Sequence, residues 1–381
     1  MRRPLTLTPV KAESVSVVFP CLNEARTLEA CIAEARHGLE ALDREGEIVV
    51  VDNGSTDGSP DIARGAGARV VHEARKGYGS ALGRGIREAK GDIVIMGDAD
   101  LSYRFDRLEP FVRAVEAGAD LVMGTRLRGS IDPGAMPMLH RRLGTPVLTW
   151  IVNLFFGTRI TDVNCGQRAL RRTSARTLDL RAAGMEFASE MVIKSALAGL
   201  QIDEVPIHFR KDGRDRPPHL RSWRDGWRHL RFILLFAPNM VLIAPGLAFL
   251  VVGAFIGGRA FLGLGEHQSA AAFSGAALII LGAQLMQVGL LVKTRYHVEG
   301  FYRRPYLERL FRFVRLETGL ILGLGLLVIG FIVGVPLVST WRADLEVPPA
   351  RVAATLTFLV LGIQVIGFSI LMSMLGIRTR R

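Results

Sequence analysis

Four long apolar stretches in the C-terminal part of the chain constrain its fold more than any other feature. They lie near Phe232–Ile256, Ala271–Val292, Leu320–Val338 and Ala353–Leu375. Each is long enough to cross the ~30 Å hydrocarbon layer of a membrane, which takes about 20 apolar residues in a helix. The first contains Pro238, Asn239 and Pro245, which favour a kink or a re-entrant entry. The sequence therefore predicts a multi-pass membrane protein with four transmembrane helices.

The basic residues between these stretches predict how the chain is oriented. The segment between the second and third stretches carries Lys293, Arg295, Arg303, Arg304, Arg309, Arg312 and Arg315, whereas the other two loops carry Arg259, Arg342 and Arg351. By the positive-inside rule the heavily basic segment is cytoplasmic, and an even number of spans puts both termini on that side. The N-terminal residues also lack the apolar run of ~7–15 residues that marks a signal peptide. We therefore expect a cell (inner) membrane protein whose N-terminal part is cytoplasmic.

The part of the chain that precedes the membrane stretches reads as an α/β domain, because strand-like apolar runs alternate with helical patterns. The strand-like runs are Ser14–Phe19, Glu47–Val51, Arg69–Val71, Asp92–Met96 and Asp120–Met123. Alternation of this kind is typical of βαβ units and predicts a mostly parallel sheet.

These patterns divide the chain into four parts. They are a tail of residues 1–13, an α/β domain of residues 14–216, a juxtamembrane amphipathic helix of residues 217–231, and a transmembrane part of residues 232–377 with a basic cytoplasmic loop at 293–316. In the third part, Trp223, Trp227 and Leu230 recur at i, i+4 and i+7 between arginines. This spacing predicts a helix that lies in the headgroup layer of the membrane.

The net charge of +12 raises the question of nucleic-acid binding, and the location of the arginines answers it. Many flank the apolar stretches, where basic residues set orientation and attract anionic lipid headgroups. They are Arg221, Arg224, Arg228, Arg231, Arg378, Arg380 and Arg381. No nucleic-acid recognition module is visible. The three cysteines show neither a paired spacing nor a metal-site spacing. We therefore expect membrane lipid rather than nucleic acid as a partner, and no disulfide framework.

Three polar or acidic turns follow the strand-like runs. They are residues 20–24 after the first run, residues 52–57 after the second, and Asp98-Ala-Asp100 after the fourth. Parallel sheets bind ligands beyond the carboxyl ends of their strands. Asp98 and Asp100, at i and i+2 in an extended segment, project to the same side, where they could hold a divalent cation together with diphosphate oxygens. The turns predict a site for a phosphorylated ligand with Mg²⁺ or Mn²⁺, and no serine-hydrolase, P-loop or zinc-protease motif competes with it.

At these same turns the sequence resembles the inverting family 2 glycosyltransferases. The matching motifs are F-P-C-L-N-E at Phe19–Glu24, V-V-D-N-G-S-T-D-G-S at Val50–Ser59 and G-D-A-D-L-S at Gly97–Ser102. Together they are specific, and the resemblance covers roughly residues 14–231. The branch looks like that of the polyprenyl-phosphate glycosyltransferases, which is similar to dolichol-phosphate mannose or glucose synthases. The resemblance implies a GT-A (Rossmann-like) nucleotide-sugar-binding domain in front of the four membrane helices.

The resemblance implies donor-side roles for residues of the three turns. The nucleotide would be bound by Pro20, Asn23, Glu24, Asp52, Asp57 and Asp98. Asp98 would lie beside the sugar and diphosphate while Asp100 binds Mg²⁺ or Mn²⁺ directly, so the two carboxylates form the metal site. In the mannose-phosphate branch a Gln often stands where this chain has Ser102, so no third protein ligand is assigned.

The resemblance also implies residues on the phosphate and acceptor side. They are Arg126, Arg141, Arg142, Glu190, Lys211 and Arg214, the last two in a motif whose Ser-Lys is absent here. Arginine suits this role because its guanidinium binds phosphate in a bidentate fork. Residues Gly129–Met138 would form a lid over the donor, and Asp162 would lie near the acceptor. The expected catalytic residues are Asp98, Asp100, Arg126 and Arg142.

The resemblance implies an enzyme that moves a hexose from a nucleotide-sugar to a polyprenyl phosphate by metal-dependent inverting displacement. UDP-glucose is the donor that the branch resemblance implies first, with GDP-mannose, UDP-galactose and UDP-N-acetylglucosamine open. A phosphate acceptor is already anionic at neutral pH, so it needs no general base. One alternative is a glycosyltransferase that extends a glycan from a hydroxyl, with Glu190 or Asp162 as base. The other is a non-enzymatic membrane scaffold or channel-forming protein. The lipid length and the formation of a homo-oligomer stay open.

Overall fold

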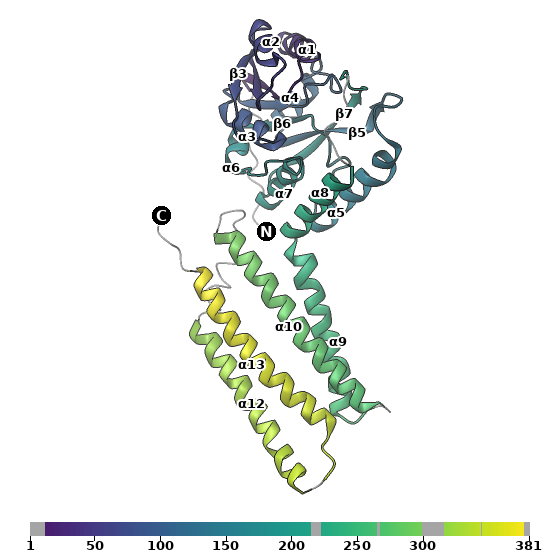
Figure 1. The fold of residues 1–381 in the computed structure, drawn as a ribbon, viewed down its shortest axis with the longest axis vertical. Coiled ribbons are helices and arrows are strands. Elements are labelled where there is room, and N and C mark those ends of the chain that lie inside the picture. Colours follow the sequence, from purple (N-terminus) through teal and green to yellow (C-terminus); the bar gives the residue numbers. More distant parts are fainter. Residues whose placement is uncertain (1–11, 215–221, 265–266, 299–315, 344, 377–381) are drawn as a thin grey trace. The chain divides into compact units, whose positions relative to one another are not determined.

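The computed structural model describes residues 12–214, 222–264, 267–298, 316–343 and 345–376. They belong to two compact units, Met1–Phe236 and Ala237–Arg381 (Figure 1). Some expectations concern other residues. The tail up to residue 11, the start of the juxtamembrane segment at 217–221, and residues 299–315 of the basic loop lie outside the described residues.

The first unit is built on a seven-stranded sheet with the strand order β3-β2-β1-β4-β6-β5-β7. The strands are β1 (Ser14–Cys21), β2 (Glu45–Asp52), β3 (Arg69–His72), β4 (Ile93–Met96), β5 (Leu121–Ile131), β6 (Arg168–Arg171) and β7 (Ile202–Phe209). β1 pairs in parallel with β2 and β4, β2 with β3, and β5 with β7, whereas β6 runs antiparallel to β4 and β5. The predicted mostly parallel, Rossmann-like sheet is confirmed.

Helices connect these strands. They are α1 (Leu28–Glu40), α2 (Ser59–Gly65), α3 (Tyr78–Glu88), α4 (Glu109–Glu116), α5 (Thr145–Phe156), α6 (Arg172–Thr177), α7 (Phe187–Ala198) and α8 (Ser222–Phe236), with a π-helical turn η1 (His140–Gly144) leading into α5. α1 begins at Leu28, after a turn in which Thr27 N donates to Glu24 O at 3.0 Å.

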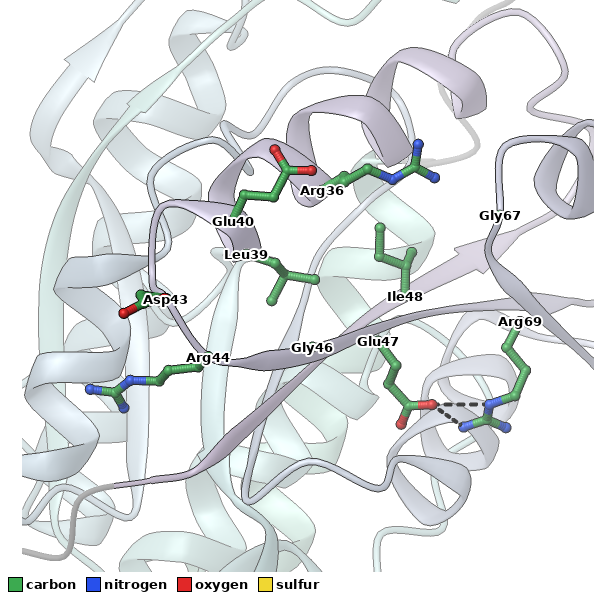
Figure 2. A pocket seen from close by; sticks show the side chains of 10 residues that line it. All are labelled: Arg36, Leu39, Glu40, Asp43, Arg44, Gly46, Glu47, Ile48, Gly67 and Arg69. Carbon is green, nitrogen blue, oxygen red and sulfur yellow. Dashed lines mark hydrogen bonds and ion pairs between the residues drawn. The ribbon is translucent and has the colours of Figure 1, made fainter.

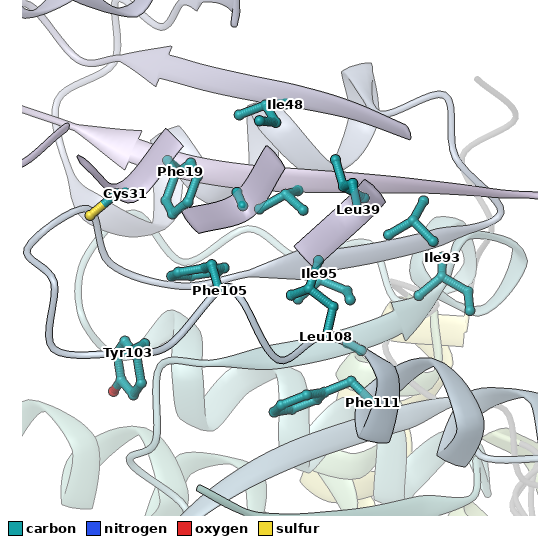
Figure 3. Close-up of a cluster of buried hydrophobic side chains, with 14 of the residues drawn as sticks. Phe19, Cys31, Leu39, Ile48, Ile93, Ile95, Tyr103, Phe105, Leu108 and Phe111 are labelled. Atoms are coloured by element: carbon teal, nitrogen blue, oxygen red, sulfur yellow. The ribbon is translucent and has the colours of Figure 1, made fainter. Parts of the chain in front are cut away.

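A cluster of buried apolar side chains anchors the loop that follows β4 (Figure 3). Phe19 of β1 and Phe105 of that loop are both fully buried and pack edge to face, with ring centroids 4.5 Å apart. Gly97 lies against the same ring, since a Cβ at this position would come within 2.7 Å of Phe105 Cζ. This packing fixes the path of the loop that carries Asp98 and Asp100.

The second unit contains four helices that are long and apolar enough to cross a membrane, as predicted. They run over Asn239–Phe261, Gln268–Val298, Leu316–Arg342 and Pro349–Leu375. The first combines a π-helical turn η2 (Asn239–Ile243) with α9 (Ala244–Phe261), and the others are α10 (Gln268–Val298), α12 (Leu316–Arg342) and α13 (Pro349–Gly376). Few of their side chains are buried within the unit, as expected of surfaces that face lipid.

The first span starts later than the apolar pattern suggested. We expected it from Phe232, but residues up to Phe236 belong to α8, and the helix that can cross a membrane begins at Asn239. Pro238 lies between the two, and its missing N–H prevents it from continuing the hydrogen bonding of α8. Pro245 is tolerated because it lies in the first turn of α9, where proline is commonly accepted.

Glycines allow α9 and α10 to pack closely. A Cβ added at Gly253 would lie 2.8 Å from the carbonyl oxygen of Gly275, and one added at Gly282 would lie 2.6 Å from that of Gly246. Small residues at membrane helix contacts let the two backbones approach each other. Gly258, on the same helix as Gly253, has nothing within 4 Å of such an added atom.

We predict that Gly253→Ala destabilises the membrane unit by about 1–3 kcal/mol, the usual cost of overpacking a close contact. The thermal unfolding midpoint in detergent should fall, whereas Gly258→Ala on the same helix should leave it unchanged or slightly higher. Equal midpoints for the two variants would show that α9 and α10 do not pack through Gly253.

Candidate active site

The carboxyl ends of β1, β2 and β4 meet at one edge of the sheet, because β1 lies between its two parallel partners. Hydrogen bonds join the loops that follow β1 and β2. Thr56 N donates to Asn23 Oδ1 at 2.7 Å, and Ala25 N donates to Asp57 Oδ2 at 2.9 Å. Thr27 Oγ1 donates to Ala99 O at 2.6 Å and ties the first loop to the one after β4. The structure therefore brings the three predicted turns together.

The loop after β4 holds Asp100 in a defined position. Asp100 is buried, and its Oδ1 accepts hydrogen bonds from the backbone N–H of Ser102, at 3.0 Å, and from the Ser102 hydroxyl. Leu101 has a φ of 66°, a left-handed conformation that is rare for a leucine and is found where surrounding structure enforces it. Ser102 thus orients Asp100.

Asp98 lies beside Asp100, and the negative charge of Asp100 disfavours its ionised form. Burial and the neighbouring Asp100 charge together raise the pKa of Asp98 to about 7, although a hydrogen bond from Tyr78 opposes the rise. A divalent cation between the two carboxylates would remove this repulsion. Among the described residues no cluster of three or more His, Cys, Asp or Glu could hold a metal. The pair therefore suits a cation such as Mg²⁺ or Mn²⁺ that takes its remaining ligands from substrate phosphates and water.

Arg214 already supplies positive charge at this position. Its Nη2 lies 2.7 Å from Asp100 Oδ2, and its Nη1 lies 3.5 Å from Glu24 Oε1. The segment around it is fastened to the same loop, since Gly213 N donates to Asp100 O at 2.9 Å and Arg210 N donates to Ser102 O at 2.9 Å. The structure thus brings Arg214 to the predicted metal site, whereas Lys211, three residues earlier, is exposed.

The loop after β2 shapes a second acidic position at Asp52. Its carboxylate accepts hydrogen bonds from Ser55 N at 2.9 Å and Gly54 N at 3.2 Å, and its Oδ2 lies 3.1 Å from His72 Nδ1. Although burial raises it, these hydrogen bonds bring the pKa of Asp52 below its ordinary value. Pro20 lies one residue before the end of β1 beside this loop, in register with Val51. Asp52 is therefore an ionised acceptor at the edge of the sheet.

His72 and Tyr78 belong to this site although neither was predicted from the sequence. His72 ends β3 in register with Asp52, and Tyr78 begins α3 and hydrogen-bonds Asp98. The strand pattern ended one residue before His72. Extending it by that residue would have put the imidazole at the same sheet edge as Asp52.

Arg126 and Asp162 form a buried ion pair. Arg126 Nε lies 2.7 Å from Asp162 Oδ2 and its Nη2 lies 2.9 Å from Oδ1, while the Arg126 backbone N–H donates to the same carboxylate at 3.1 Å. Although burial lowers it, the Asp162 charge raises the pKa of Arg126 above its ordinary range. Two of the three guanidinium nitrogens are thus occupied by a carboxylate, and Asp162 is not positioned as a free base.

Glu190 is also engaged inside the protein. It is 2% exposed on α7, its Oε1 lies 2.8 Å from Lys194 Nζ, and it accepts hydrogen bonds from the backbone N–H groups of Arg181 and Ala182. The next residue of that loop, Ala183, accepts from Gly79 N at 2.9 Å. Glu190 therefore orders a loop that supports the start of α3, where Tyr78 lies.

The remaining predicted residues lie on exposed segments. Arg141 and Arg142 are exposed in η1. The proposed lid at Gly129–Met138 is wrong at its start, because β5 continues to Ile131 and pairs there with Phe209 of β7. Backbone hydrogen bonding to β7 keeps these residues in the sheet, and a loop begins only after them.

A pocket of about 530 Å³ lies at the opposite end of β2 and β3 from these turns (Figure 2). Glu47 near the start of β2 and Arg69 at the start of β3 line it and form an ion pair of 2.8 Å. None of the predicted site residues lines this pocket. The three predicted turns thus lie at the carboxyl ends of the strands, away from this pocket.

Two protein-family models match the chain. Residues 16–178 match the family described as glycosyl transferase family 2, and residues 290–376 match the family 2 C-terminal transmembrane region. The chain is 36% identical over 380 residues to the low-salt glycan biosynthesis hexosyltransferase of Haloferax volcanii, a match that covers 96% of this chain and 90% of that protein. It is 29% identical over 205 residues to a dolichyl-phosphate hexose transferase of the same organism, covering 54% of this chain and 86% of that protein.

Among solved structures, the chain is similar to glucosyl-3-phosphoglycerate synthase from Mycobacterium tuberculosis in complex with Mn²⁺, uridine-diphosphate and phosphoglyceric acid. The two are 24% identical, with a TM-score of 0.43 over 59% of this chain and 77% of that chain.

We predict that Asp162→Asn is strongly destabilising, because it leaves the buried guanidinium of Arg126 without its counter-charge. Breaking one partner of such a pair costs about 3–5 kcal/mol, or roughly 6–20 °C in the thermal unfolding midpoint. As a control, Asp61→Asn removes one partner of the exposed Arg64–Asp61 pair, whose side chains are 52% and 85% exposed, and should change the midpoint very little. An unchanged midpoint with complete loss of activity would instead favour Asp162 as a catalytic base.

We predict that Arg214→Gln raises the affinity of the nucleotide-free protein for Mn²⁺ roughly 3–10-fold, because it removes a positive charge next to Asp100. The amount of free Mn²⁺, followed by electron paramagnetic resonance, reports this affinity directly. Arg104→Gln is the control, since Arg104 pairs with Asp106 in the same loop rather than with Asp100. Weaker Mn²⁺ binding by Arg214→Gln than by the control would mean that the cation does not bind at Asp100.

Proposed function

Because this chain belongs to glycosyl transferase family 2, we propose that it transfers a hexose from a nucleotide-sugar to a polyprenyl phosphate. The observation that carries the proposal is the Asp98–Asp100 pair, held against the loops of β1 and β2, in a chain with four candidate membrane helices. The names of two relatives, a hexosyltransferase and a dolichyl-phosphate hexose transferase, support the hexose and the lipid acceptor. UDP-glucose is the first donor to test and GDP-mannose the second.

The nucleoside would bind at the loops after β1 and β2. Asp52, ionised at neutral pH, can accept N–H groups of the base, and His72 lies 3.1 Å from it to fix its orientation. Asp57 is shared with the first loop through Ala25 N, so binding at one loop constrains the other. The proposed nucleoside site would be completed by Pro20, Asn23 and Glu24. Nucleotide recognition in this proposal rests on backbone hydrogen bonds that hold the acceptor groups rigid.

Asp98 and Asp100 would hold Mg²⁺ or Mn²⁺ together with the donor diphosphate. A bound cation would stabilise the negative charge that develops on the departing nucleoside diphosphate. Ser102 keeps Asp100 oriented for this task, and Tyr78 does the same for Asp98. Arg214, next to Asp100, would turn to the diphosphate oxygens when the cation takes its place.

In the proposed reaction an oxygen of the lipid phosphate attacks the anomeric carbon of the sugar. The new C–O bond forms as the bond from that carbon to the donor diphosphate breaks, so the configuration inverts and the nucleoside diphosphate leaves. The acceptor oxygen is already ionised, so no residue has to remove a proton. The two side-chain hydrogen bonds from Arg126 to Asp162 use Nε and Nη2. Through Nη1, Arg126 would contact the phosphate groups together with Arg142.

The burial of both candidate bases supports a phosphate acceptor over a hydroxyl acceptor. Asp162 is fully buried against Arg126, and Glu190 is 2% exposed against Lys194. A hydroxyl acceptor would need a carboxylate within hydrogen-bonding reach of its proton. The basic loop at 293–316 supports a cytoplasmic catalytic domain in a cell membrane.

We predict metal-dependent transfer of label from UDP-glucose to undecaprenyl phosphate, followed as radioactivity in the organic phase. Asp100→Ala should lower this transfer about 100-fold or more, since it removes a direct metal ligand. Asp106→Ala, in the same loop but paired with Arg104, is the matched control and should keep most of the activity.

A panel of labelled nucleotide-sugars in the same assay identifies the donor. If donors are bound or hydrolysed but the lipid stays unlabelled, the acceptor assignment is wrong and a hydroxyl-bearing glycan takes its place. If no donor is bound in the presence of Mn²⁺, the enzymatic proposal itself fails.

A further inference from the structure

Helix α5 presents several large apolar side chains outward and buries two threonines. Thr145, Thr149 and Val152 are its buried residues. Five large apolar side chains on and just before the helix are exposed instead, by 54, 56, 43, 63 and 50% in chain order. They are Leu139, Leu143, Val147, Trp150 and Leu154, and we call them the α5 stripe.

The α5 stripe forms one continuous face. Its last four members follow one another at steps of four, three and four residues, which keeps them on one side of a helix with 3.6 residues per turn. The opposite face is fastened to the domain by hydrogen bonds. Val163 N donates to Thr149 Oγ1 at 3.1 Å, and Asn164 Nδ2 donates to Thr145 Oγ1 at 3.4 Å. These contacts fix the rotation of α5 and keep the stripe on the surface.

A water-exposed stripe of this kind is costly. The hydrophobic effect favours the burial of large apolar side chains, and contiguous apolar patches on a soluble surface normally mark a contact with a membrane or another protein. The domain therefore gains free energy if something apolar covers α5.

The connection between the first unit and the first membrane span places α5 close to a bilayer. Within the first unit α5 packs against α8, and the two lie next to each other in Figure 1. α8 ends at Phe236, three residues before the first membrane span begins at Asn239. Three residues reach at most about 11 Å, so the end of α8 stays at the membrane surface. A helix packed against α8 is therefore held close to lipid.

The residues around the stripe suit the boundary between headgroups and acyl chains. Arg141 and Arg142 are exposed on the turn that leads into α5, where they can meet lipid phosphates. Trp150 at the centre of the stripe, and the exposed Trp227 of α8, are of the residue type enriched at membrane interfaces. Charge and apolarity are thus arranged as in an interfacial helix.

We propose that the α5 stripe inserts into the acyl boundary of the membrane, so that the domain rests on the bilayer through α5 as well as through its covalent anchor. The partner is the lipid surface itself, and the proposal does not depend on which sugar or acceptor the enzyme uses. The segment Val163–Asn164, held by the inner face of α5, follows Asp162, the partner of Arg126. Insertion therefore also sets the height of the candidate acceptor side above the membrane.

The test uses the full-length chain in nanodiscs with one introduced cysteine at a time. The native cysteines Cys21, Cys31 and Cys165 are buried, and burial raises the pKa of Cys31 and Cys165 to about 12, so an introduced surface cysteine is labelled selectively. The environment-sensitive fluorophore NBD is attached at Val147→Cys or Leu154→Cys. Arg64→Cys on α2, where the side chain is 52% exposed, is the matched control.

We expect NBD at the two stripe positions to emit at shorter wavelength and to be quenched by lipids with a nitroxide high on the acyl chain, at least twofold more than at position 64. Emission and quenching equal to the control would overturn the proposal. So would a blue-shifted emission that lipid nitroxides do not quench, because a protein surface rather than lipid would then cover the stripe. Both readouts are independent of sugar transfer, so a failure of the proposed function leaves this test intact.

Discussion

The parallel pairing of β1 with β2 on one side and β4 on the other is the constraint on which the candidate site depends. Cys21 stands in register with Asp52, and Val18 with Met96, so the three strands deliver their following loops to one edge of the sheet. Residues from distant parts of the sequence then share hydrogen bonds, as Asn23 does with Thr56. Gathering acidic turns in this way concentrates negative charge, and the rest of the site is organised around that charge.

Buried charge is handled in two different ways on this sheet. The Arg126–Asp162 pair is complete in itself, with a bidentate contact and a backbone donor, so it needs no ligand to be stable. The Asp98–Asp100 pair is not, since Asp98 is left with a pKa of about 7 even with Arg214 close to Asp100. A cation binds most favourably where negative charge is not yet neutralised. This contrast, more than the presence of acidic residues, distinguishes the position that a metal would occupy from the one that holds the fold.

The sequence predicted the sheet and the convergence of three turns because strand periodicity and the polarity of strand ends are local signals. It did not predict which partner a charged group would take. An arginine fork fits a phosphate and a carboxylate equally well, so the pairing of Arg126 with Asp162 depended on a tertiary contact. The first span was misplaced for a related reason. Phe232–Phe236 is as apolar as the residues after Pro238, so apolarity alone does not mark the boundary, which depends on Pro238 and on the packing of α8 in the first unit.

In helix α5 the hydrophobic periodicity does not mark the face that packs on the core of the domain. A stripe of large apolar residues normally marks the face that packs on the core, and a pair of threonines marks the surface. Here Val163 and Asn164 bind the threonines, so the core side is decided by hydrogen bonds that no periodicity reveals. In water that arrangement would be unfavourable, but a chain tethered to a bilayer has a second apolar phase available. In the proposed reaction the apolar tail of the acceptor would remain in that phase, and a domain that rests on the membrane through α5 would lie close to the lipid phosphate at the membrane surface.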